Sequence, residues 1–228
     1  KEILFSTYII KSDEIGFANL KMLVDAAQRG VKVRMILDGL GNKLPTDMLL
    51  YLADQGVEIK IFNKKNWVRP STFVRRMHGK MLIVDGAYCL VGGRNIDNEY
   101  YRMDSTDNFL DREVLIRGDQ ALEKATIHFN AMWKHKVICT DLKGTFCPDD
   151  RGRCETLLDK SIKEVAHQLP SLRKLRIADT ISTADATRPT INPVQFMYSN
   201  FTYGKNGRIR RSSHFDRRVT RELLKLVA

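Results

Sequence analysis

Short apolar segments alternate with amphipathic segments over the first 62 residues of the chain. Three of them are apolar and rich in β-branched side chains, as strands are: residues 3–10, 31–37 and 57–62. Between these segments apolar residues recur at helical spacing, and each helical pattern stops at a glycine, Gly30 and Gly56. The order strand, helix, strand, helix, strand predicts an α/β fold in which a mixed, mostly parallel sheet is sandwiched between helices.

Three more strands and a long helix are predicted before residue 138. Residues 80–84 are apolar on both faces, as expected of a strand buried inside a sheet. A turn at residues 85–86 leads to a strand at 88–91, which ends where two glycines follow. A strand at 111–118 and an amphipathic helix at 122–137 complete this part of the chain.

Beyond residue 138 the pattern loses its regularity. Residues 139–193 are predicted as a loop-rich insertion and linker, with a helix near residues 156–169. Three cysteines in the insertion fit free thiols and a disulfide equally well. Residues 194–228 pair a strand-like segment with a helix-like segment at 215–227.

One stretch of the chain places reactive side chains at fixed spacing within eighteen residues: His78, Lys80, Asp85, Gly92-Gly93 and Asn95. Six such identities would coincide by chance on the order of once per 10^5 to 10^6 chains of this length. Because the pleat of a strand has a period of two, His78 and Lys80 share a face, whereas Asp85 has the opposite parity and lies at the turn. An imidazole and an ammonium on one face can converge on one phosphate.

The pattern H-x-K-x4-D-x6-G-G-x-N resembles the signature of the phospholipase D superfamily. The continuation from Gly92 to Tyr100 resembles the bacterial cardiolipin synthase and phosphatidyltransferase branch, which commonly has Gly at the position of Gly93, where most members have Ser. The resemblance covers residues 1–138 and implies a phospholipase D-like half domain. It also implies that residues 194–228 are the truncated start of a second repeat.

The resemblance implies chemical roles for the motif. One histidine of the family attacks phosphorus and forms a phosphohistidine, while a second histidine protonates the leaving oxygen. By this resemblance His78 is the nucleophile, and no metal or other cofactor is needed. The other expected roles are phosphate binding by Lys80, Gly93 and Asn95, bracing of the turn by Asp85, and fixing of the second ring nitrogen by Asp111 or, as second candidate, Glu99.

The sequence contains one H-x-K motif, because none of the other four histidines is followed by Lys at the second position. An active unit would therefore need either a second motif after Ala228 or a symmetric homodimer that brings two copies of His78 together. The second-repeat-like segment favours the first arrangement.

The net charge is +11, with 38 Lys and Arg against 27 Asp and Glu. Such a balance favours anionic partners, and it fits a phospholipid membrane surface and a nucleic acid alike. No apolar run approaches the roughly 18 residues that a membrane span requires. Together with the resemblance, this favours a bacterial membrane-associated or periplasmic protein without a transmembrane segment in this chain.

The expected function is hydrolysis or phosphatidyl transfer on phospholipids through a phosphohistidine, with this chain supplying one of two motifs. Two alternatives remain. A nuclease-type phosphodiesterase could act as a homodimer on nucleic acid. The chain by itself could also be a non-catalytic half module that binds anionic lipid or phosphate.

Overall fold

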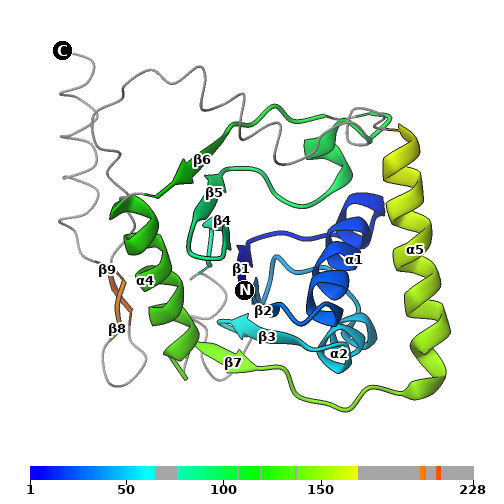
Figure 1. Ribbon diagram of the computed structural model, residues 1–228, viewed down its shortest axis with the longest axis horizontal. Helices are drawn as coiled ribbons and strands as arrows, with labels where there is room; N and C mark the ends of the chain where they lie inside the picture. Colours follow the sequence, from blue (N-terminus) through cyan, green and yellow to red (C-terminus); the bar gives the residue numbers. More distant parts are fainter. Residues whose placement is uncertain are drawn as a thin grey trace.

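The structure is a computed structural model that describes residues 1–64, 76–106, 108–118, 120–136, 138–168, 201–203 and 209–211. Its main feature is a seven-stranded sheet with the order β6-β5-β4-β1-β2-β3-β7 (Figure 1). The strands are β1 (Glu2–Thr7), β2 (Lys32–Asp38), β3 (Val57–Phe62), β4 (Lys80–Val84), β5 (Tyr88–Gly92), β6 (Glu113–Arg117) and β7 (Cys139–Asp141). A separate two-stranded sheet joins β8 (Phe201–Tyr203) and β9 (Ile209–Arg211).

Helices cover both faces of the large sheet. The helices are α1 (Glu14–Gln28), α2 (Thr46–Asp54), α4 (Gln120–Lys134) and α5 (Arg151–Gln168), with short 3₁₀ turns η1 (Asn98–Tyr101) and η2 (Pro148–Asp150). Figure 1 shows α4 on one face and α1, α2 and α5 on the other. No helix within the described ranges is long and apolar enough to cross a bilayer.

The predicted α/β class and the mixed sheet are confirmed, but less of the sheet is parallel than expected. Strands β1, β2 and β3 are parallel neighbours. The other four pairings, β1 with β4, β4 with β5, β5 with β6 and β3 with β7, are antiparallel. For β4 and β5 the physical reason is the short turn between them, since a tight hairpin can join only antiparallel strands.

Alternation along the central strands supplies two cores. Phe5, Met35 and Ile61 are buried against α1, α2 and α5. Their neighbours along the chain, Leu4 and Ile36, point to the other face and pack with Phe129 and other residues of α4. The central strands are therefore buried by helices on both faces of the sheet.

Residues 139–168 are more regular than the predicted loop-rich insertion. They form β7, η2 and the 18-residue α5, which packs along α1. The cause is a helical stripe of buried residues that faces α1: Cys154, Leu158, Ser161 and Val165. The expected boundary at residue 193 and the expected second repeat at 194–228 stay predictions. The helix-like segment 215–227 lies outside the described residues.

Candidate active site

The topology brings five chain segments to one edge of the sheet. Tyr8 follows the carboxyl end of β1, and Asp38 is the last residue of β2. Because β4 runs antiparallel to β1, its first residue, Lys80, lies at the same edge. Lys80 pairs with Gly92 at the end of β5, and Gly92 pairs with Glu113 at the start of β6. The carboxyl ends of parallel strands are where α/β sheets usually bind ligands.

His78 and Lys80 meet at this edge, as the pleat predicts. Lys80 Nζ lies 3.3 Å from His78 Nδ1. An ammonium group can only donate, so Nδ1 accepts and the neutral imidazole carries its proton on Nε2. The Lys80 side chain is buried, at 9% exposure, whereas the His78 side chain is exposed. The imidazole is thus open to a substrate, and the ammonium supports it from the protein side.

The surroundings of His78 and Lys80 lower the pKa of both groups. Burial lowers the pKa of the Lys80 ammonium, and the Asp111 carboxylate opposes this effect. Partial burial of the largely exposed His78 ring, followed by the charge of Lys80, lowers the pKa of the imidazole, while the charge of Asp38 opposes it. A lowered histidine pKa leaves the ring neutral at neutral pH, and only a neutral imidazole has a lone pair for attack on phosphorus.

Tyr8 packs against both members of the pair. The ring centroids of Tyr8 and His78 are 4.8 Å apart, with an interplanar angle of 38°. Lys80 Nζ lies 5.6 Å from the centroid of the Tyr8 ring. An aromatic face at this distance attracts an ammonium and leaves it fewer orientations. Sequence reasoning missed Tyr8, although its place at the end of a predicted strand was an available signal.

Gly93 and Asp111 are fitted to one another. A Cβ at position 93 would lie 2.7 Å from Asp111 Oδ1 and closer still to Oδ2, so a side chain there would overlap the carboxylate. The backbone N–H of Arg112 donates to Asp111 Oδ1 at 2.7 Å, which fixes the carboxylate in this position. A glycine at 93 therefore allows the carboxylate of Asp111 to approach the backbone beside Lys80.

Asn95 lies on the same edge, but among the described residues no hydrogen bond joins its side chain to His78 or Lys80. Its side chain is buried, and Nδ2 donates to the hydroxyl of Tyr100 at 3.2 Å. Its Oδ1 has no hydrogen-bond partner among the described residues. The amide is thus oriented by Tyr100, and a second N–H remains to be offered to a ligand.

Neither expected acid holds the second nitrogen of the histidine ring. Within the described ranges no hydrogen bond joins Asp111 or Glu99 to His78. Asp111 acts on Lys80 instead, and Glu99 forms an ion pair with Lys11. The carboxylate whose charge acts on His78 is Asp38, which the sequence analysis did not single out.

Asp85 lies at the opposite end of β4 from Lys80. Five residues of strand separate them by about 17 Å, at ~3.4 Å per residue. Asp85 and Gly86 both have positive φ, 53° and 60°, as a type I′ hairpin turn requires. Asp85 Oδ1 accepts a hydrogen bond from the backbone N–H of Glu2 at 2.7 Å. The acid of the motif thus ties the hairpin to the start of β1 and does not meet the other motif residues.

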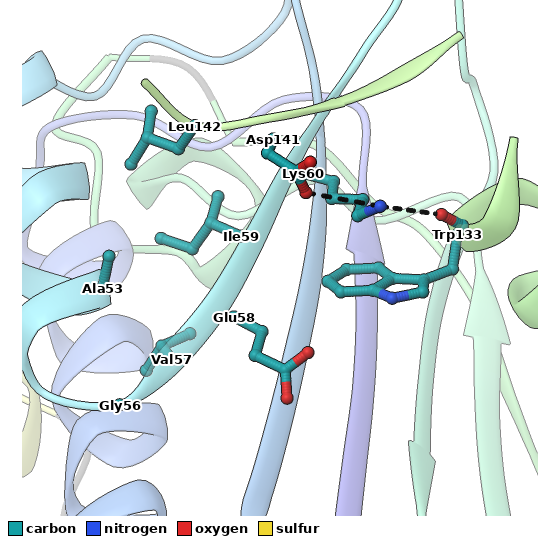
Figure 2. Close-up of a pocket in the computed structure, with 9 residues that line it drawn as sticks. All are labelled: Ala53, Gly56, Val57, Glu58, Ile59, Lys60, Trp133, Asp141 and Leu142. Atoms are coloured by element: carbon teal, nitrogen blue, oxygen red, sulfur yellow. Dashed lines mark hydrogen bonds and ion pairs between the residues drawn. The ribbon is translucent and has the colours of Figure 1, made fainter. Parts of the chain in front are cut away.

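A hollow of about 540 Å³ lies elsewhere, along the outer edge of β3. Figure 2 shows Lys60 between Asp141 and Trp133, with Nζ 3.3 Å from an Asp141 oxygen and 3.1 Å from the Trp133 carbonyl oxygen. The hollow shares no lining residue with the edge at His78. Within the described ranges no group of three or more His, Cys, Asp or Glu side chains is placed to hold a metal ion.

A family model described as "Cardiolipin synthase, PLD-like domain" matches residues 1–133. The match covers more than half of the chain, so the chain belongs to this phospholipase D-like family. The family assignment that the His78 motif suggested is therefore confirmed.

The individual relatives are longer proteins, and the chain matches only part of each of them. An uncharacterized protein of Helicobacter pylori (strain J99) is 34% identical over 180 residues, which are 73% of this chain and 34% of that protein. Cardiolipin synthase C of Escherichia coli (strain K12) is 34% identical over 142 residues, 58% of this chain and 30% of that protein. A solved phosphatidylserine synthase of Haemophilus influenzae Rd KW20 superposes with a TM-score of 0.49 at 16% identity, covering 73% of this chain and 39% of that one. The chain spans about a third of the length of these curated relatives.

Proposed function

We propose that the chain supplies one half of an active site that cleaves or transfers the phosphodiester of a phospholipid. His78 is the nucleophile in this proposal, and a second histidine comes from outside the 228 residues or from a second copy of the chain. Water as acceptor makes the protein a phospholipase, and the hydroxyl of a second phospholipid gives cardiolipin-type synthesis. The site works at a membrane surface, where the substrate is found.

The contact between His78 and Lys80 carries the proposal. A neutral, exposed imidazole beside a buried ammonium is suited to attack on a phosphodiester, because the anion repels nucleophiles unless its charge is offset. The chain belongs to a family whose model is described as a cardiolipin synthase domain, and this membership supports a phospholipid as the substrate. The net charge of +11 favours anionic surfaces in general.

The reaction runs in two displacements. An unprotonated ring nitrogen of His78 forms a bond to phosphorus, the bond to the leaving alkoxide breaks, and the second histidine protonates that oxygen. The acceptor hydroxyl then gives its proton to the second histidine and displaces His78 from phosphorus. When the substrate binds, the hydrogen bond of Lys80 passes from Nδ1 to a non-bridging oxygen, which frees the Nδ1 lone pair for the attack. In this proposal the Asn95 amide and the backbone at Gly93 complete the phosphate contacts.

The test is turnover of phosphatidylglycerol vesicles by the full-length protein, with products separated by chromatography. His78→Asn is expected to lose at least about a thousandfold in kcat. The matched control is His167→Asn, because His167 is exposed on α5 and takes no part in the site. A covalent phosphate on His78, trapped during turnover and located by mass spectrometry, is the second expected result. An adduct on another residue, or unchanged turnover in His78→Asn, would refute the assignment.

A nucleic-acid phosphodiesterase acting as a homodimer is the second candidate, and the net charge of +11 favours it. It predicts cleavage of single-stranded DNA at low salt, with a rate that falls steeply as salt rises. Vesicle turnover without cleavage of an oligonucleotide would exclude it.

The third candidate, a half module that binds anionic lipid without turnover, rests on the single motif in this sequence. Light scattering combined with the vesicle assay on the 228-residue chain separates the cases. A monomer that binds vesicles without turnover supports the half module, whereas an active dimer supports a symmetric site.

A further inference from the structure

The side chain of Asp38 is fully buried, at 0% exposure, where β2 ends. One of its oxygens, Oδ1, accepts from the backbone N–H groups of Leu40 and Gly41 at 2.8 and 2.9 Å. These two bonds close the turn that follows the strand and fix the carboxylate on the sheet. The position of the Asp38 carboxylate is therefore fixed by the end of β2 and the turn after it, independently of the motif residues.

The same carboxylate also holds the residues that lead into the motif. Its Oδ2 accepts from the backbone N–H of Met77 at 2.9 Å. Arg76 Nε donates to both oxygens at 3.0 and 3.1 Å, and Arg76 Nη2 lies 2.8 Å from Oδ1. His78 is the next residue along the chain. These hydrogen bonds to Arg76 and Met77 therefore fix the backbone that leads into His78.

Arg76 extends this contact to the next strand. Its Nη2 also donates to the carbonyl oxygens of Phe62 and Asn63, at 3.3 and 3.2 Å, where β3 ends. A single guanidinium thus connects the ends of β2 and β3 to the segment before His78. A buried ion pair of this kind adds little net stability compared with apolar packing, because both charges lose their hydration. A role beyond stability is therefore the better account of it.

Four groups act on the His78 ring or on its neighbour. Lys80 reaches it from β4, the ring of Tyr8 packs on it after β1, and Asp38 acts on it from the end of β2. Asp111, before β6, acts on Lys80. Each of the two adjacent side chains thus has a carboxylate that acts on it, Asp111 for the lysine and Asp38 for the histidine. Without Asp38 the ring would face the charge of Lys80 with no opposing carboxylate.

We propose that Asp38 is a positioning residue for the nucleophile: through Arg76 and Met77 it fixes the approach of His78 to the phosphate, and its charge stabilises the ring when that ring becomes cationic. The inference rests on the proposed function for its effect on turnover. Its effect on the titration of His78 stands without that function, because no substrate is involved.

The first test is Asp38→Asn in the full-length protein, with the His78 ring followed by NMR as the pH is changed. Asp38 raises the pKa of His78, so its loss is expected to lower that pKa further, and the acid limb of the kcat/KM profile moves to lower pH. The kcat is expected to fall at least about tenfold, with a smaller change in KM, because small displacements of a reacting group cost this much or more. Asp54→Asn is the matched control, since Asp54 is paired with Arg151 on the surface, 2.7 Å away.

Arg76→Lys separates position from charge. It keeps a positive charge beside Asp38 but removes the forked contact, so kcat should fall while the pKa of His78 stays at its wild-type value. This variant also decides the matter if Asp38→Asn fails to fold. A folded Asp38→Asn protein with the wild-type titration of His78 would overturn the inference, as would Arg76→Lys with wild-type kcat. If His78 titrates as expected but no phospholipid is turned over, the proposed function fails and the inference about the charge of Asp38 stands.

Discussion

Replacing Asp85 with Ala should weaken the fold and leave the chemistry of His78 intact. The structure places Asp85 in the β4–β5 turn, with its carboxylate on the backbone N–H of Glu2 and its backbone at a φ of 53°. Its own backbone N–H donates to the Glu2 carbonyl oxygen at 2.8 Å, a bond that the substitution keeps. The prediction therefore concerns one side-chain hydrogen bond and one strained backbone position.

The expected loss of stability is about 2 kcal/mol. A hydrogen bond to an ionised acceptor contributes about 1.5–3 kcal/mol, and solvent exposure of Asp85 reduces this to about 1 kcal/mol. Left-handed backbone costs about 1 kcal/mol in a residue such as Ala, whereas Asp and Asn adopt it more easily. For a chain of this size about 2 kcal/mol lowers the Tm by about 4–8 °C.

Urea and thermal unfolding of wild type, Asp85→Ala and Asp85→Asn measure this. Asn keeps an acceptor oxygen and tolerates the left-handed backbone, so Asp85→Asn should lose less than about 1 kcal/mol. Phosphatidylglycerol turnover is measured at a temperature where all three proteins are folded, and kcat should then differ by less than about threefold. A stable, folded Asp85→Ala protein with kcat reduced a hundredfold would show that the acid acts on the reaction and would refute the structural role.

Two further substitutions probe the other end of β4. Gly93→Ala should lower kcat about tenfold to a hundredfold in the vesicle assay, because the new methyl group displaces the Asp111 carboxylate. In an Asp111→Ala background the same substitution should lower kcat little further than Asp111→Ala alone does. An equal loss of kcat in both backgrounds would contradict a steric overlap between the methyl group and the carboxylate. Lys80→Met should raise the activation barrier of the reaction by about 3–4 kcal/mol. Because the Lys80 charge lowers the pKa of His78, the substitution should also raise that pKa in an NMR titration. A His78 titration unchanged from wild type would show that Lys80 and His78 are not in contact.

The sequence was sufficient for the elements that local pattern determines. The strands around the motif, the helix at α4 and the pairing of His78 with Lys80 follow from periods of 2 and 3.6 residues. The same parity argument separated Asp85 from the pair, and the hairpin geometry agrees with it.

Contacts between distant segments could not be predicted in this way. The strand β4 adds to β1, and β7 adds to β3, although neither pair is consecutive in the sequence. Tyr8 and Asp38 reach His78 only through that order of strands, and a periodic pattern does not specify which strands are neighbours. Asp111 was expected on His78 from the family resemblance, while its neighbours in the structure place it against Gly93 and beside Lys80.

The place of β4 beside β1 also concerns the order in which the protein folds. The pairing of Ser6 with Met81 closes a loop of more than 70 residues, and contacts of such sequence separation form slowly because chain entropy is lost before they can contribute. During synthesis β1, β2 and β3 leave the ribosome well before β4 and can already begin to pair. The His78 ring reaches Tyr8 only after the β4–β5 hairpin has paired with β1. Its NMR signal is therefore expected to report the pairing of β4 with β1 and to appear late in refolding.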